Sequence, residues 1–148
     1  MRAPGFRKAL PADWRAIRTL LATSRLPIEG ARDHLGSFLV AHDETGLLAC
    51  GGLEFHGSAA LLRSVAVDAR HRGAGLGTEL VTRLRLLALE RRVDTLALLT
   101  ASAESWFQRL GFRTVPRERL PGVLEASAEL RGACPASATA MLLDLRPN

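Results

Sequence analysis

The sequence predicts a single α/β domain in which helices flank one mixed β-sheet, and three observations support this fold class. The chain has 148 residues, 47% of them hydrophobic and 24% charged, which suits one globular domain with its own core. Strand-like and helix-like patterns alternate along the chain. The turn Asp-Glu-Thr-Gly at residues 43–46 joins two apolar runs and predicts an antiparallel hairpin. We therefore expect residues 1–148 to form one domain.

The first half of the chain is predicted to form strands around that hairpin, with helices before it. Pro11 opens the first helix, because proline suits the first helical position, and the apolar residues that follow it share one face. The expected elements are a strand at residues 6–9, the helix that Pro11 opens, a shorter helix at residues 28–35, strands at residues 37–42 and 47–55, and a buried strand at residues 59–67.

The second half is predicted to alternate helices with strands. Leu76, Leu80, Leu84 and Leu87 recur at helical spacing, which predicts an amphipathic helix that ends near Arg91. The remaining expected elements are a strand at residues 95–100, a short helix at residues 103–110 that Gly111 ends, a strand that begins at Phe112, and a closing strand at residues 140–145.

A glycine-rich stretch, RHRGAGLGTEL at residues 70–80, lies between a predicted strand and the first turn of a predicted helix. The first N–H groups of a helix have no intrahelical partner, and the helix dipole places positive potential there. Gly73, Gly75 and Gly77 permit unusual dihedrals and close approach by a ligand. The stretch therefore predicts a phosphate site, although a tight connection without a ligand would also use glycines. It lacks the GK[ST] ending of a P-loop.

With these motifs the chain resembles the GCN5-related N-acetyltransferase (GNAT) family over nearly its whole length. Arg72, Gly75 and Gly77 match the family's Arg/Gln-x-x-Gly-x-Gly/Ala signature, and WFQRLGF at residues 106–112 resembles its aromatic helix and Gly-Phe step. The chain also resembles the arsenic-resistance (ArsN-like) branch of this family, in the segments LPIEG, LLRSVAV, LLTASAESWFQRLGF and CPAS.

The resemblance implies a mostly antiparallel GNAT-type sheet and an acetyl-CoA-dependent transfer to a primary amine. It also implies a bulge near Val65 that turns the backbone amide of this residue toward the thioester carbonyl, which is why Val65 is a candidate catalytic residue. Ala66 and Val67 would pair with the pantetheine arm like an added strand. The residues expected to bind acetyl-CoA are Val65, Ala66, Val67, Arg70, His71, Arg72, Gly73, Ala74, Gly75, Leu76, Gly77, Thr78 and Phe107.

The chain departs from the family pattern because it contains no tyrosine. Many members carry a tyrosine where this chain has Phe107, and that tyrosine protonates the departing sulfur. A thiol has a pKa of about 8.5, so its thiolate leaves tolerably well near neutrality. Water, a helix N-terminus or Ser105 is therefore expected to assist, although Ser105 also suits an ordinary helix surface.

The general base is sought among Glu54, His56 and Glu29. Glu54 and His56 end a strand beside the predicted strand at residues 59–67, and Glu29 lies where the family commonly builds the acceptor wall. Glu54 and Glu29 are the carboxylates predicted to take part in catalysis. Glu29 and His56 are also candidates for contact with the substrate. Each of these residues would also be ordinary on a solvent-exposed surface without a role in catalysis. A base that acts on the amine through a chain of water molecules is a further alternative.

Arg63 is a charged residue inside an otherwise apolar predicted strand, where a charge is costly to bury unless it is paired. Two interpretations remain open. The guanidinium would bind a carboxylate of the acceptor by a bidentate contact, or it would form a structural ion pair with a neighbouring acid.

Composition limits the other partners. The net charge is +5, but every basic residue except Lys8 is an arginine and acids are interspersed among them, so no nucleic-acid partner is expected. No apolar stretch resembles a signal peptide or a membrane span, which predicts a cytoplasmic protein without a membrane partner. Cys50 and Cys134 have no metal-ligand spacing, and His34 and His42 belong to no recognisable motif, so no metal is expected. A homodimer is left open.

The sequence therefore leaves three function classes. The first is an N-acetyltransferase for a small, amino-acid-like amine, such as arsinothricin or phosphinothricin if the arsenic-resistance resemblance holds. The second is an acetyltransferase for proteins or aminoacyl-tRNA. The third is a CoA-binding sensor without turnover.

Overall fold

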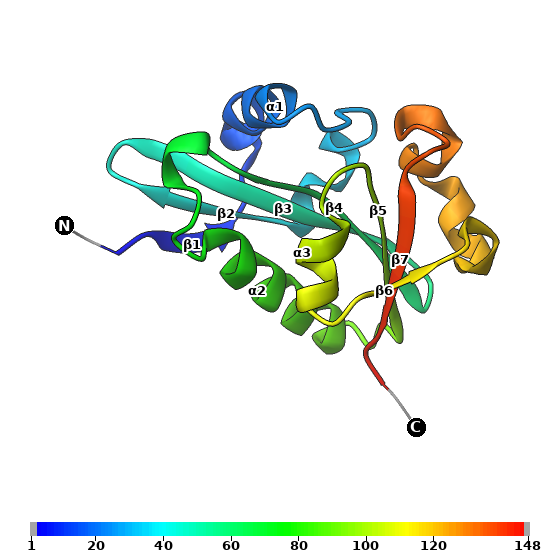
Figure 1. Cartoon of the computed structure of the whole chain (residues 1–148). Helices are drawn as coiled ribbons and strands as arrows, with labels where there is room; N and C mark the ends of the chain where they lie inside the picture. The colour runs from blue at the N-terminus through cyan, green and yellow to red at the C-terminus, as the bar shows by residue number, and fades with distance from the viewer. Residues whose placement is uncertain (1–2, 147–148) are drawn as a thin grey trace.

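The computed structural model describes residues 3–146 and builds one seven-stranded sheet with helices on both faces (Figure 1). The strands are β1 (Gly5–Lys8), β2 (Phe38–Asp43), β3 (Gly46–His56), β4 (Ala59–Val67), β5 (Thr95–Thr100), β6 (Arg113–Val115) and β7 (Thr139–Asp144). The α-helices are α1 (Trp14–Thr23), α2 (Leu76–Glu90) and α3 (Glu104–Arg109), and short helical turns include η2 (Arg32–Ser37), η3 (Ala69–His71), η4 (Arg117–Arg119), η5 (Gly122–Ala126) and η6 (Glu129–Ala133).

The sheet is mixed but mostly antiparallel. Its strand order is β1-β2-β3-β4-β5-β7-β6. Among the described residues only β4 and β5 pair in parallel, and every other neighbouring pair is antiparallel. The predicted fold class is therefore confirmed, including the hairpin of β2 and β3.

The two faces of the sheet are covered by different segments. Val81 and Leu84 of α2 pack with Leu53 and Leu62 of the sheet, in a core that α3 completes. On the other face α1 packs over the strands through residues such as Ile17, and the helical turns between residues 117 and 133 cover the neighbouring region. Figure 1 shows α1 and α2 on opposite sides of the central strands.

A bulge in β4 changes which side chains face which layer. Gly52 pairs with Arg63 and Cys50 pairs with Ala66, so two residues of β4, Ser64 and Val65, lie opposite the single residue Gly51 of β3. Leu62 before the bulge and Val65 after it both pack on the α2 face, although simple alternation would place them on opposite faces. The bulge expected near Val65 is present.

Two segments differ from the sequence-based expectation. The helix expected at residues 28–35 is replaced by the short turn η2, because Gly30 adopts a φ of 80° that no α-helix continues through. Residues 117–133, for which no element was predicted, contain η4, η5 and η6. Pro116 and Pro121 precede two of these turns and prevent a longer periodic helix that a pattern could reveal.

We expect Gly52→Ala to destabilise the sheet, because an added Cβ would lie 2.2 Å from ring atoms of the fully buried Phe38. Overpacking of this kind costs about 1–3 kcal/mol, which lowers the melting temperature by several degrees in a domain of this size. Gly36→Ala is the matched control, since an added Cβ there meets nothing within 4 Å. Thermal melts of both variants test the clash, and equal melting temperatures would contradict it.

Candidate active site

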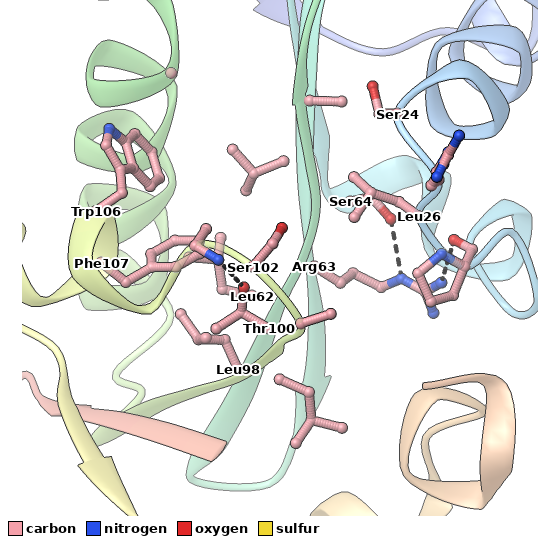
Figure 2. Close-up of a pocket in the computed structure, with 18 of the residues that line it drawn as sticks. Ser24, Leu26, Leu62, Arg63, Ser64, Leu98, Thr100, Ser102, Trp106 and Phe107 are labelled. Atoms are coloured by element: carbon pink, nitrogen blue, oxygen red, sulfur yellow. Dashed lines mark hydrogen bonds between the residues drawn. The ribbon is translucent and has the colours of Figure 1, made fainter. Parts of the chain in front are cut away.

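A cleft of about 1170 Å³ opens between β4 and β5. The two strands pair only over residues 59–61 and 95–97, and from Leu62 and Leu98 onward both strands line the cleft. Trp106 and Phe107 of α3 lie on one side in Figure 2, and Arg63, Ser64 and Leu26 lie on the other. The separation of two parallel neighbours leaves backbone groups of β4 without a partner in β5, and these groups are available to an extended ligand.

The bulge positions Val65 beside this cleft. Ser64 has a φ of 61°, which is strained for a residue other than glycine. The Cys50 thiol donates a 3.3 Å hydrogen bond to the Ser64 carbonyl, and the Arg63 Nε donates to the Ser64 Oγ at 3.1 Å. Val65, Ala66 and Val67 all line the cleft, so the structure brings the three predicted β4 residues together there.

The glycine-rich stretch reaches the same cleft at the N-terminus of α2. Gly73 and Gly75 adopt φ values of 85° and 82°, and no neighbouring atom lies within 4 Å of where their Cβ atoms would be. Gly75 is the N-cap of α2, so the first N–H groups of this helix have no intrahelical acceptor. The dihedrals, the open space and the helix dipole fit a diphosphate.

Most of the predicted cofactor residues line the cleft, but two do not. Arg70 is highly exposed and is bonded to Asp68, and Ala74 is exposed. Neither belongs to the cleft wall. The glycine-loop residues that do line it are His71, Arg72, Gly73, Gly75, Leu76, Gly77 and Thr78.

The side chain of Arg63 is fully buried beside the cleft, where all three of its nitrogens bond within the protein. Nη1 donates to the Glu54 Oε2 at 2.6 Å, and Nη2 donates to the carbonyls of Glu29 at 2.9 Å and Pro27 at 3.4 Å. Nε, already bonded to Ser64, lies 3.4 Å from the Glu129 Oε2. The interpretation of Arg63 as a clamp for a substrate carboxylate needs correction, because a substrate would have to displace these partners. The structural ion pair is present instead.

Glu54 is enclosed by hydrogen-bond donors and does not reach the cleft. Burial alone would raise the pKa of Glu54, but hydrogen bonds from His56 and Arg63 outweigh it and hold that pKa below its ordinary value. The Ser127 Oγ also donates to the Glu54 Oε2 at 3.1 Å. The structure therefore corrects the assignment of Glu54 as a base that contacts the substrate.

His34, for which the sequence showed no constellation, lies beside Glu54 and His56. The two Nε2 atoms are 3.5 Å and 2.9 Å from the same oxygen, Oε1 of Glu54, and the three groups are close enough to ligate one ion. However, Arg63 already balances the charge of Glu54, and a divalent cation would lie close to this guanidinium. The hydrogen bond between His56 and Glu54, with His34 at ion-pair distance from the same oxygen, accounts for the cluster without a metal. His56 does not line the cleft, which corrects its assignment to substrate contact.

The other predicted side chains are divided between the cleft and the surface. Glu29 lines the cleft, and its Oε2 accepts the backbone N–H of Ile28 at 3.2 Å. Phe107 lines the cleft and packs edge-on against Trp106 and Phe112. Ser105 is exposed and lies outside the cleft wall, so the structure does not support it as the group that assists the leaving sulfur.

Sequence reasoning missed Glu129, a buried acid that lines the cleft. Burial raises the pKa of Glu129 to about 7 although Arg63 acts to lower it, and the Cys134 thiol hydrogen-bonds to its carboxylate. Burial and the nearby Glu129 raise the pKa of the Cys134 thiol to about 12. A single acid next to Leu130 in an irregular segment carries no local signal, and only the proximity to Arg63 in the fold identifies it.

The fold and the site define an acetyltransferase-type α/β domain, and comparison with known families agrees. Residues 34–114, more than half of the chain, match the model of the acetyltransferase (GNAT) domain family. The chain belongs to this family.

The curated relatives that the chain is similar to include amino-acid acetyltransferases and a further N-acetyltransferase. Amino-acid acetyltransferases of Pseudomonas putida and Pseudomonas fluorescens are 34% identical over 86 residues, which is 57% of this chain and 20% of theirs. An uncharacterized N-acetyltransferase, CT2212 of Chlorobaculum tepidum, is 27% identical over 64% of this chain and 61% of its own length. The chain thus spans about a fifth of the length of the amino-acid acetyltransferases that it matches.

Solved structures have the same fold. The Mycobacterium tuberculosis protein Rv2747, solved in complex with CoA, is 26% identical with a TM-score of 0.77, over 97% of this chain and 100% of its own. N-acetylglutamate synthase of Neisseria gonorrhoeae, complexed with CoA and N-acetyl-glutamate, has a TM-score of 0.83 at 18% identity, over 99% of this chain and 36% of its own. Among residues 3–146, no helix has the length and apolar character that a membrane span requires.

We expect Arg63→Met to lower the free energy of unfolding by about 3–5 kcal/mol, because it leaves buried acids without their cation. Arg7→Met is the matched control. Arg7 forms a bridge of similar length to Asp13, 2.7 Å against 2.6 Å for Arg63 and Glu54, but its side chain is 39% exposed, so its loss should cost about 1 kcal/mol or less. Urea denaturation measures both values, and similar losses would contradict the structural role of Arg63.

Proposed function

We propose that this chain is an acetyl-CoA-dependent N-acetyltransferase that acts on the primary amine of a small, amino-acid-like molecule. One observation carries the proposal. The bulged strand β4 separates from β5 at the point where the glycine loop meets the N-terminus of α2, so one cleft offers both an unpaired strand and an anion site. Membership of the GNAT family and the CoA bound to the similar Rv2747 support this interpretation.

In this proposal the cofactor end of the cleft acts through backbone groups. Acetyl-CoA supplies an activated acetyl group as a thioester. The N–H groups at the start of α2, with Gly73, Gly75 and Arg72, hold its diphosphate. Ala66 and Val67 bind the pantetheine arm as an added strand. The amide of Val65 stabilises the negative charge that develops on the carbonyl oxygen during amine attack.

The departing sulfur needs no tyrosine in this site. The chain contains none, and Phe107 packs against other aromatic rings at the cleft wall. A thiolate with a conjugate-acid pKa of about 8.5 is a tolerable leaving group near neutral pH. We therefore assign Phe107 a packing role beside the cofactor, and water or the attacking nitrogen supplies the proton.

The acceptor is proposed to be an amino acid or a close analogue. The curated relatives named amino-acid acetyltransferases and the N-acetyl-glutamate bound in the Neisseria structure support this class. Arsinothricin and phosphinothricin are included because the sequence resembles the arsenic-resistance branch. We further propose a single-domain cytoplasmic enzyme that needs neither a metal nor nucleic acid, and a homodimer is compatible with it.

A panel of acceptors tests the proposal. Thiol release from acetyl-CoA is measured with L-amino acids, arsinothricin, phosphinothricin, peptides with a free N-terminus, and an aminoacyl-tRNA. We expect the fastest release with one of the first three acceptor classes. Faster release with peptides or with tRNA would favour a macromolecular acceptor. CoA binding without release for any amine would favour the sensor.

We expect Gly75→Asp to weaken CoA binding at least about tenfold, because it adds bulk and negative charge at an anion site. Gly57→Asp is the matched control. Gly57 also has a positive φ, 64° against 82°, and also has nothing within 4 Å of a Cβ, but it lies in the β3–β4 turn outside the cleft. Isothermal calorimetry with CoA measures both variants. Equal affinities in two folded variants would remove the phosphate-loop assignment.

A further inference from the structure

We propose that Glu129 is the general base of the reaction and takes a proton from the ammonium group of the acceptor. This inference rests on the proposed acetyl transfer and names the residue that prepares the amine for it. The acids that line the cleft among residues 3–146 are Glu29 and Glu129. Three acids are candidates for the base, namely Glu54, Glu29 and Glu129. They differ in their access to the cleft and in the hydrogen bonds that their carboxylates already accept.

Glu54 and Glu29 are both less suited to this role. Glu54 lies outside the cleft wall, and its two oxygens accept hydrogen bonds from Arg63, Ser127 and His56. Glu29 lines the cleft but is exposed, and its carboxylate accepts the N–H of Ile28. An exposed carboxylate that already accepts a hydrogen bond is less suited to take a proton from a bound amine than a buried carboxylate in the cleft wall.

Glu129 combines access to the cleft with burial. It lines the cleft and is 3% exposed. Its backbone is fixed on both sides, since its N–H donates to the Ser127 Oγ at 3.2 Å and its carbonyl accepts the Cys134 N–H at 3.1 Å. A rigid, nearly dry carboxylate suits proton transfer from a bound amine.

Arg63 places Glu129 close to the reacting end of the cleft. The Arg63 Nε lies 3.4 Å from the Glu129 Oε2 and 3.1 Å from the Ser64 Oγ. Ser64 directly precedes Val65, the residue whose amide is proposed to face the thioester carbonyl. The Arg63 guanidinium therefore links the Glu129 carboxylate to the bulge. We propose that the acceptor amine approaches from this side.

The charges around Glu129 come from several elements. Arg63 of β4 lowers its pKa, Glu54 of β3 raises it, the Cys134 thiol on its own segment donates to it, and burial has the largest effect, so that its pKa is about 7. Glu54 in turn contacts His34 and His56. A group with this pKa is ionised at slightly alkaline pH and still basic enough to accept a proton from an ammonium group.

The proton balance is complete without a further acid. Glu129 takes one proton from the ammonium group, and the free amine then forms the bond to the acetyl carbon. The C–S bond breaks, and the second proton of the nitrogen goes to the sulfur. Glu129 returns its own proton to solvent before the next turnover. The missing tyrosine is consistent with this sequence, since the attacking nitrogen itself supplies the proton for the thiol.

The kinetic test uses the fastest amine of the acceptor panel and compares three variants. We expect Glu129→Gln to lower kcat/KM about 100- to 10,000-fold and to abolish the limb that rises through about pH 7 in the parent profile. CoA affinity should stay within about twofold. Glu125→Gln, an exposed acid in the preceding turn, should keep both the rate and the limb, whereas Glu29→Gln tests the other acid of the cleft. Loss of the limb in Glu29→Gln alone would overturn the assignment, as would its persistence in Glu129→Gln.

A second measurement does not depend on activity. Carbon NMR of protein labelled at the glutamate side-chain carboxyl follows each carboxyl through a pH titration, and the Glu129 signal is the one missing from Glu129→Gln. We expect its midpoint near pH 7, whereas a midpoint at pH 4–5 would overturn the inference. If the parent transfers no acetyl group to any amine while this midpoint is found, the proposed function has failed and the acidity of Glu129 stands. Should Glu129→Gln not fold, Glu129→Asp replaces it in both measurements, with a partial loss of rate expected.

Discussion

The bulge at Ser64 and Val65 determines which residues of β4 can serve the cleft. Without it, strict alternation would place Val65 on the same face as Arg63, away from α2. The extra residue restores Val65 to the α2 face, while the Arg63 side chain bonds the loop that follows α1. The left-handed dihedral of Ser64 costs on the order of 1 kcal/mol or more. Hydrogen bonds from Cys50 and Arg63 to Ser64 hold this conformation in place.

Arg63 links segments that the sheet alone does not hold together. Because β4 and β5 separate after three paired residues, no β-ladder among residues 3–146 joins these two strands along the cleft. The guanidinium instead bonds the loop at Pro27 and Glu29, the strand β3 through Glu54, and the turn at Glu129. One positive charge faces two buried carboxylates. Glu54, with the closer contact and more donors, keeps the negative charge, and the pKa of Glu129 rises.

The parts of the fold that could be predicted from sequence are those with local signals. The bounds of β4 and β5 match the expected strands, and α2 ends within one residue of its expected end, because periodicity and turn residues mark these elements. The glycine loop was recognisable for the same reason. Arg63 was correctly identified as needing an anion, but the choice between a substrate and Glu54 depended on strand register. Glu129 was missed because its partners lie far away in the sequence, in β3 and β4.

The two ends of the cleft therefore respond differently to sequence change. In the proposed enzyme, the cofactor end uses backbone groups of one continuous segment, from the bulge through the glycine loop into α2, so its geometry tolerates many side chains provided that the glycines remain. The proposed acceptor end is lined by three separate segments, around residues 24–29, Arg63 and residues 129–138, and it contains charged side chains. Exposed positions in the first and third segments can vary without disturbing the Arg63 cluster. Substitutions that change the acceptor are thus compatible with an unchanged cofactor site, provided that the buried guanidinium of Arg63 keeps its two carboxyl partners, Glu54 and Glu129.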